Sequence, residues 1–64
     1  MGTTAGTPNK IRILTVDDHP LILEGIANVL QRQPDMEVVG EASDGYEAIE
    51  AFAKWRPDVT LVDL

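Results

Sequence analysis

Three short apolar runs alternate with two segments of helical periodicity, and this alternation restricts the fold more than any other feature of the sequence. The runs are IRILTV at 11–16, EVVGEA at 37–42 and DVTLVD at 58–63. Short β-branched runs that alternate with helices are typical of parallel strands joined by crossover helices. The order predicts an α/β layer with right-handed crossovers. Glu37 and Glu41 suit a strand at the edge of the sheet.

A first helix is predicted between the first two runs. Pro20 suits the first turn of a helix, and Asp18 or His19 stands where a capping side chain is expected. Apolar residues then recur at helical spacing, which extends the helix to about Gln33. These residues are Leu23, Ile26, Ala27 and Leu30.

A second helix is predicted between the second and third runs. Asp44 and Glu47 have the spacing of a capping box, and Pro57 stops the helix. Phe52 and Trp55 are expected to pack in the core and at the helix end, because aromatic side chains at helical spacing usually bury area. The full apolar stripe is Ala48, Ile49, Phe52 and Ala53.

Composition excludes several classes of function. The 64 residues contain no cysteine and one histidine, so disulfides and thiolate metal sites are absent from this sequence. The formal charge of −6 argues against direct binding of nucleic acid by this segment, which would need clustered Lys and Arg. No apolar run approaches the length of a membrane span, so no membrane partner is expected. These features are compatible with a cytoplasmic protein.

The sequence is long enough for one small domain at most. Residues 1–9, rich in Gly, Thr and Pro, are interpreted as a disordered leader, and residues 10–64 as the folded part. Parallel strands that are apolar on both faces need neighbours at both edges, yet the third run ends one residue before Leu64. We therefore expect an incomplete domain.

Carboxylates follow the first and third runs. Asp17, Asp18 and Asp63 should share one edge, because the carboxyl ends of parallel strands meet on the same side of a sheet. If the first and third strands are neighbours, the repulsion must be relieved by a proton on one carboxyl or by a shared divalent cation. Mg²⁺ fits the second option, because it binds a few carboxylates and keeps positions open for a phosphoryl oxygen.

This acidic edge suggests phosphoryl transfer. Asp63 is the candidate nucleophile because it stands alone at its strand end, Asp18 would ligate the metal directly, and Asp17 would do so directly or through water. The Asp17–Asp18 pair alone is equally compatible with a helix cap beside a solvated acid. His19 is assigned no functional role, because a single histidine at a helix start more often caps or packs.

The sequence resembles the receiver domains of bacterial two-component response regulators, in particular the NarL/FixJ (LuxR-type) subgroup. The matching segments are VDDHP at 16–20, VVGEASDG at 38–45 and RPDVTLVDL at 56–64, which together with their spacing span almost everything after the leader. The resemblance implies a flavodoxin-like (CheY-like) fold. The chain would form its β-α-β-α-β N-terminal half, with strand order 2-1-3.

The resemblance also implies a mechanism. Asp63 would be phosphorylated by a sensor histidine kinase, with Asp17 and Asp18 in the Mg²⁺ pocket, and the output would be transcriptional through a DNA-binding domain that this sequence does not contain. The family's remaining site groups, which are a backbone carbonyl, a Ser or Thr and a Lys, would all lie beyond Leu64. The chain would thus act as a phosphoryl acceptor and not as an enzyme in its own right.

Two other hypotheses remain. A phosphohydrolase with a strand-end Asp nucleophile would normally have a second acid two residues after Asp63, which lies past the last residue. A metal-free pseudo-receiver or interaction fragment would act through protein contacts. The uncovered edge of the third strand, with Val59, Leu61 and Val62, predicts self-association.

Overall fold

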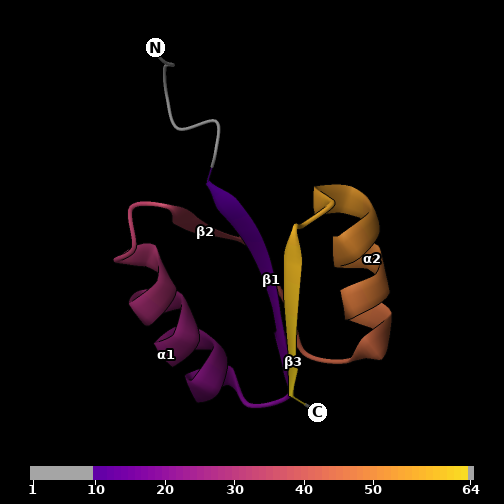
Figure 1. Cartoon of the computed structure of the whole chain (residues 1–64). Helices are drawn as coiled ribbons and strands as arrows, with labels where there is room; N and C mark the ends of the chain where they lie inside the picture. The colour runs from indigo at the N-terminus through magenta and orange to yellow at the C-terminus, as the bar shows by residue number, and fades with distance from the viewer. Residues whose placement is uncertain (1–9, 64) are drawn as a thin grey trace.

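The protein is a three-stranded parallel sheet with a helix on each face (Figure 1). The structure, a computed structural model, describes residues 10–63, so the predicted leader and Leu64 lie outside the described residues. The elements in chain order are β1 (Ile11–Asp17), α1 (Pro20–Gln31), β2 (Met36–Ala42), α2 (Gly45–Trp55) and β3 (Val59–Asp63).

The sheet has the order β2-β1-β3, with both pairings parallel. β1 is therefore central, and all its residues from Ile13 to Asp17 are buried. β2 lies at an edge, as the charges at Glu37 and Glu41 predicted. The α/β class, the strand order and the positions of all five elements are confirmed. The first helix ends at Gln31, slightly before the predicted boundary.

The two helices begin in different ways. Asp44 caps α2 by accepting a hydrogen bond from the Glu47 N–H at 2.8 Å, and Glu47 Oε1 accepts one from the Ser43 N–H at 2.8 Å, which confirms the predicted capping box. His19 occupies the cap position of α1, but its side chain makes no capping hydrogen bond. The prediction of a His19 cap was wrong, because the imidazole lies against Asp17 instead.

The core cluster lies where the β1 and β2 strands face α2, and it is built from small and medium-sized side chains. Leu14, Val16 and Ala42 form the buried cluster, and Ala48 and Ala51 of α2 pack against it. The helix thus presents alanines to the sheet, which lets the two backbones approach closely.

Two residues of the predicted apolar stripe of α2 do not face the core, because alanines occupy the side of the helix that meets the sheet. Phe52 is 51% exposed and Ile49 is 70% exposed, so neither is a core residue. Trp55 is 39% exposed and lies over Gly40 of β2, where a Cβ atom would be 3.0 Å from its Cδ1. The register between β1 and β2 shifts at the same level, since Ile13 pairs with Val38 but Leu14 pairs with Gly40. A side chain at this position would therefore press against the indole of Trp55.

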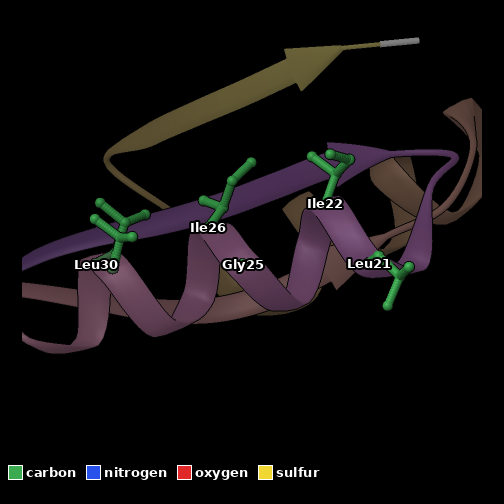
Figure 2. Close-up of a pocket in the computed structure, with 6 residues that line it drawn as sticks. Leu21, Ile22, Gly25, Ile26 and Leu30 are labelled. Carbon is green, nitrogen blue, oxygen red and sulfur yellow. The ribbon is translucent and has the colours of Figure 1, made fainter.

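An apolar groove runs along α1 (Figure 2). Leu23 is the one buried residue of this helix, whereas Leu21, which lines the groove, is 80% exposed. The groove is lined by Leu21, Ile22, Gly25, Ile26, Val29 and Leu30. Neither helix in the described range 10–63 has the length and apolar character needed to cross a membrane.

Candidate functional site

Two strand ends bring the predicted site residues to one edge of the sheet. Asp17 is the last residue of β1, Asp63 is the last residue of β3, and the parallel register pairs these two positions directly. Asp18 and His19 form the short connection from β1 to α1. We call Asp17, Asp18 and Asp63 the acidic edge.

The three carboxylates of the acidic edge differ in exposure. The Asp17 side chain is 2% exposed, whereas that of Asp18 is 58% exposed. Asp63 is also exposed. Burial makes an ionised carboxylate costly unless it is hydrogen-bonded or bound to a cation, so Asp17 is the residue whose charge most needs compensation.

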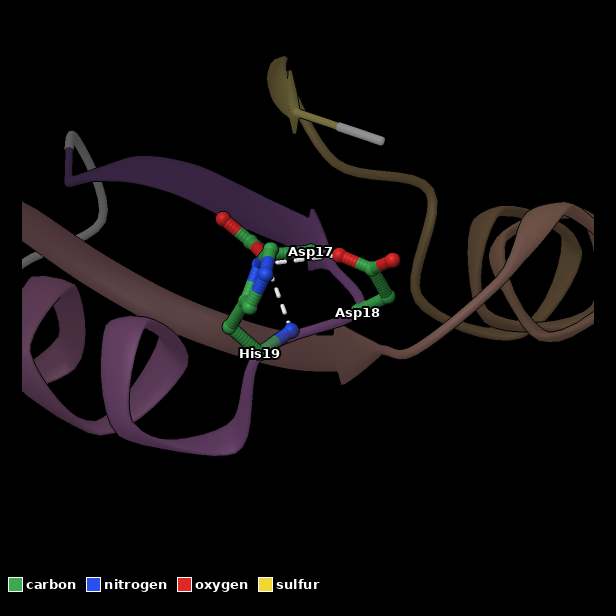
Figure 3. A group of neighbouring side chains, drawn as sticks. All are labelled: Asp17, Asp18 and His19. Carbon is green, nitrogen blue, oxygen red and sulfur yellow. Dashed lines mark hydrogen bonds and ion pairs between the residues drawn. The ribbon is translucent and has the colours of Figure 1, made fainter.

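His19 supplies part of that compensation (Figure 3). Asp17 Oδ1 accepts a hydrogen bond from the His19 backbone N–H at 2.9 Å and lies 2.7 Å from His19 Nδ1. The same Nδ1 lies 2.9 Å from Asp18 Oδ1. One imidazole nitrogen therefore bridges the two neighbouring carboxylates.

These contacts shift two pKa values in opposite directions. The hydrogen bond with the His19 side chain lowers the pKa of Asp17, although burial of the carboxyl opposes the shift. The hydrogen bond with Asp17 raises the pKa of His19, and the negative charges of Asp18 and Asp17 add to it. The charge of Asp63 also raises the pKa of His19, so Asp63 contributes to the electrostatic field at the imidazole.

One oxygen of the buried carboxylate is left without a partner. Asp17 Oδ2 is fully buried and makes no hydrogen bond within the described residues, and the same is true of Thr15 Oγ1. Thr15 and Asp17 are two positions apart on β1 and so point to the same face of the sheet. A buried carboxylate oxygen without a hydrogen-bond partner is stabilised when it coordinates a cation or accepts a hydrogen bond.

Sequence reasoning missed the part played by His19. The donor atoms of Asp17, Asp18 and His19 all lie within 4.8 Å of one another, a group that we call the three-donor cluster. Asp63 is not a member of this group, although the sheet register places it beside Asp17. The signal was present in the sequence, because a histidine directly follows the acid pair, but neither its rotamer nor its contact with Asp17 follows from spacing alone.

Most of the chain matches one family of known proteins. The response regulator receiver domain family matches residues 13–64. The transcriptional regulatory protein LiaR of Bacillus subtilis is 50% identical over 54 residues, which cover 84% of this chain and 26% of LiaR. A protein-glutamate methylesterase/protein-glutamine glutaminase of Pyrococcus abyssi is 45% identical over 58 residues, which cover 91% of this chain and 16% of that protein.

A comparison of solved structures leads to the same family. The signal receiver domain of the putative response regulator NarL from Mycobacterium tuberculosis superposes with a TM-score of 0.81 at 45% identity, covering 88% of this chain and 45% of that one. The chain spans about a quarter of the length of LiaR and less than half of the NarL receiver structure. The family match, these identities and the shared strand order show that the chain belongs to the response regulator receiver domains, among relatives of the NarL/FixJ type.

Proposed function

We propose that the chain is the phosphoryl-accepting part of a two-component response regulator, with Asp63 as the residue that a sensor histidine kinase phosphorylates. The observation that carries the proposal is the register that pairs Asp63 with Asp17. This pairing puts a solvent-exposed carboxylate beside a buried acid, at the sheet edge where open α/β folds bind their ligands.

The residues present fit a hard divalent cation. Asp17 Oδ2 is buried and unpaired, Asp18 is an adjacent carboxylate, and oxygen donors of this kind are those that Mg²⁺ prefers. Mg²⁺ held by Asp17, Asp18 and Asp63 would neutralise charge on the phosphoryl oxygens during transfer.

The chain itself would supply the nucleophile, the carboxylate of Asp63. A carboxylate oxygen of Asp63 would attack phosphorus, the bond from phosphorus to the donor would break, and the donor would leave with the electron pair of that bond. Exposure of Asp63 is necessary here, because the phosphorylated group of a partner protein must reach it.

The relatives suggest the biological setting. LiaR is named a transcriptional regulator, which favours a cytoplasmic protein whose output domain binds DNA. With a net charge of −6, this segment itself is a poor ligand for DNA, so the nucleic-acid contact belongs to residues other than these. The resemblance to a methylesterase shows that similar receivers also occur in enzymes, and the LiaR match favours the transcriptional alternative.

The test is covalent labelling. The protein incubated with acetyl phosphate and Mg²⁺ should gain the mass of one phosphoryl group, and Asp63→Asn should remove the gain. Asp35→Asn is the matched control, because Asp35 lies at the opposite edge of the sheet, where its carbonyl accepts from the Ile11 N–H at the start of β1. Equal labelling of wild type and Asp63→Asn, or no labelling of wild type, would contradict the assignment.

A second proposal concerns self-association. Every residue of β3 is exposed, and within the described residues β3 pairs with β1 alone. Val59 and Leu61 are each 42% exposed and Val62 is 62% exposed, so the free edge carries apolar side chains. An edge of this type favours pairing with a second copy of the chain.

A further inference from the structure

The charges of the chain are separated between the two ends of the sheet. All five Lys and Arg residues lie at or near the amino end of the strands, because β1 starts there and both helices finish there (Figure 1). The opposite end carries the acidic edge, together with Asp44 and Glu47 at the start of α2. The molecule therefore has a positive end and a negative end, although its net charge is −6. The five basic residues are Lys10, Arg12, Arg32, Lys54 and Arg56.

Two of these basic residues lie beside the first residue of β3. Arg56 is exposed and ends α2, and a two-residue connection joins it to Val59. Arg12 Nη1 donates a hydrogen bond to the Arg56 carbonyl at 3.0 Å, and the Asp58 N–H donates one to the Arg12 carbonyl at 2.8 Å. These bonds hold Arg56 at the amino end of β3. Asp63, at the other end of the same strand, belongs to the acidic edge.

β3 thus has opposite charges at its two ends, and these charges discriminate between the two ways in which its free edge can pair with a second copy. Parallel pairing would place the acidic edges of both copies side by side, which adds repulsion between like charges. Antiparallel pairing would place the acidic edge of each copy beside the partner's Arg56. The charge pattern therefore favours the antiparallel arrangement, which a two-fold axis generates.

The apolar residues of β3 suit such a pairing as well. Leu61 is the middle residue of the strand, so a two-fold axis at this position places Leu61 opposite its own copy. Thr60 then lies opposite the partner's Val62, and Val59 lies opposite the partner's Asp63. Val59 and Leu61 are each 42% exposed, so pairing would remove apolar surface from water on both copies.

We propose that two copies of the chain pair antiparallel along β3, so that the partner's Arg56 forms an ion pair with the acidic edge. This rests on the edge pairing proposed above and adds its orientation, its register and a residue that each copy contributes to the site of the other. Arg56 lies three residues before Val59, about 10 Å along an extended chain, which arginine and aspartate side chains together nearly span. In the dimer the guanidinium compensates negative charge that the acidic edge carries in a single copy.

Cross-linking distinguishes the two orientations, because the chain contains no cysteine of its own. Thr60→Cys and Val62→Cys are mixed in equal amounts, joined with a short bis-maleimide and identified by mass. Antiparallel pairing should give the mixed dimer well above its statistical share, because these two positions face each other across the two-fold axis. Asn28→Cys, at an exposed position on α1, is the control and should not cross-link to itself.

The other outcomes separate this inference from the proposal on which it rests. Cross-linking of Thr60→Cys and of Val62→Cys each to itself would show parallel pairing, which overturns the inference and leaves edge pairing intact. Absence of any cross-linked product would overturn both. A mixed dimer formed by a chain that acetyl phosphate does not label would support the inference and contradict the assignment of Asp63 as phosphoryl acceptor.

A pair of charge reversals tests the contribution of Arg56. Arg56→Glu should raise the dissociation constant of the dimer by about tenfold or more, because it places a negative charge beside the partner's acidic edge. Arg32→Glu makes the same change in net charge at the end of α1, a helix that does not contact β3 within the described residues, and should raise the constant by less than about threefold. Sedimentation over a range of concentrations measures both. Equal effects of the two variants would overturn the ion pair.

Discussion

Asp17 and Asp63 end neighbouring parallel strands, and the register pairs them directly at the carboxyl edge of the sheet. The two residues differ in environment, since Asp17 is buried and Asp63 is exposed. Their side chains carry like charges at one level of the sheet, and the backbone rather than any attraction holds them there. The site is therefore formed at a cost in repulsion that a cation can remove.

The first prediction follows from this repulsion. Asp63→Asn should raise the melting temperature of the metal-free chain, because one of the opposing charges is lost. Mg²⁺ should raise the melting temperature of the wild type, since a ligand that binds only the folded state stabilises it, and should raise that of the variant less. Thermal unfolding followed by circular dichroism, with Asp35→Asn as control, measures both effects. A lower melting temperature for metal-free Asp63→Asn would contradict this account.

The second prediction concerns pH. The lowered pKa of Asp17 gives stability that is present above the ordinary Asp value of about 3.9 and lost as pH falls through the folded value. The raised pKa of His19 gives stability that is complete below about 6.5 and lost as pH rises through the folded value. Wild type should thus exceed His19→Gln in stability most between about pH 4 and 6.5. Urea unfolding across pH measures the difference, and a difference independent of pH would show that the imidazole contributes only packing.

The third prediction compares two glycines. Gly40→Ala should destabilise the fold by about 1–3 kcal/mol, because its Cβ would lie 3.0 Å from Trp55 Cδ1 and 3.4 Å from Leu14 Cδ1. Gly25→Ala, in α1 with nothing within 4 Å of the added atom, should stabilise the fold by about 0.5–1 kcal/mol. Urea unfolding followed by Trp55 fluorescence reports both changes. Equal effects at the two positions would argue against close contact between the indole and β2.

The fourth prediction tests the capping box of α2. Asp44→Ala should cost about 1 kcal/mol, because the Glu47 N–H loses its acceptor. Asp44→Asn should retain most of the stability, since its side-chain oxygen can still accept that bond. The free energy of unfolding from urea titration measures both variants. If Asp44→Asn lowers the free energy of unfolding as much as Asp44→Ala does, the charge and not the hydrogen bond stabilises the start of α2.

The fifth prediction concerns the free edge of β3. Val62→Lys should shift the chain toward monomer, because a charge on an exposed edge strand disfavours pairing. Asn28→Lys, an exposed position on α1, adds the same charge away from that edge. Sedimentation over a range of concentrations compares the two variants with wild type. A wild type that stays monomeric throughout would remove the basis for edge pairing.

The sequence predicted the elements well because each boundary carries a strong local signal. Pro20 and Asp44 mark helix starts, and the apolar runs mark the strands. It also predicted which edge gathers Asp17 and Asp63, because parallel topology alone places strand ends together. What spacing could not supply was distance between side chains.

The errors all arose from such tertiary contacts. Periodicity placed Phe52 in the core, but α2 turns Ala48 and Ala51 toward the sheet instead. No sequence pattern marks Gly40 as a close contact, because only the folded structure shows that Trp55 occupies the space above it. His19 was expected to cap or pack, and its contact with Asp17 depends on a rotamer that no sequence pattern reports.

The central position of β1 has a consequence for biosynthesis. β1 is synthesised before both of the strands with which it pairs, because β2 and β3 follow it in the chain. Long-range pairing of this kind forms late, after the intervening chain has been ordered. A nascent polypeptide therefore exposes its tandem aspartates before the acidic edge can form, because Asp63 reaches that edge only when β3 has paired with β1.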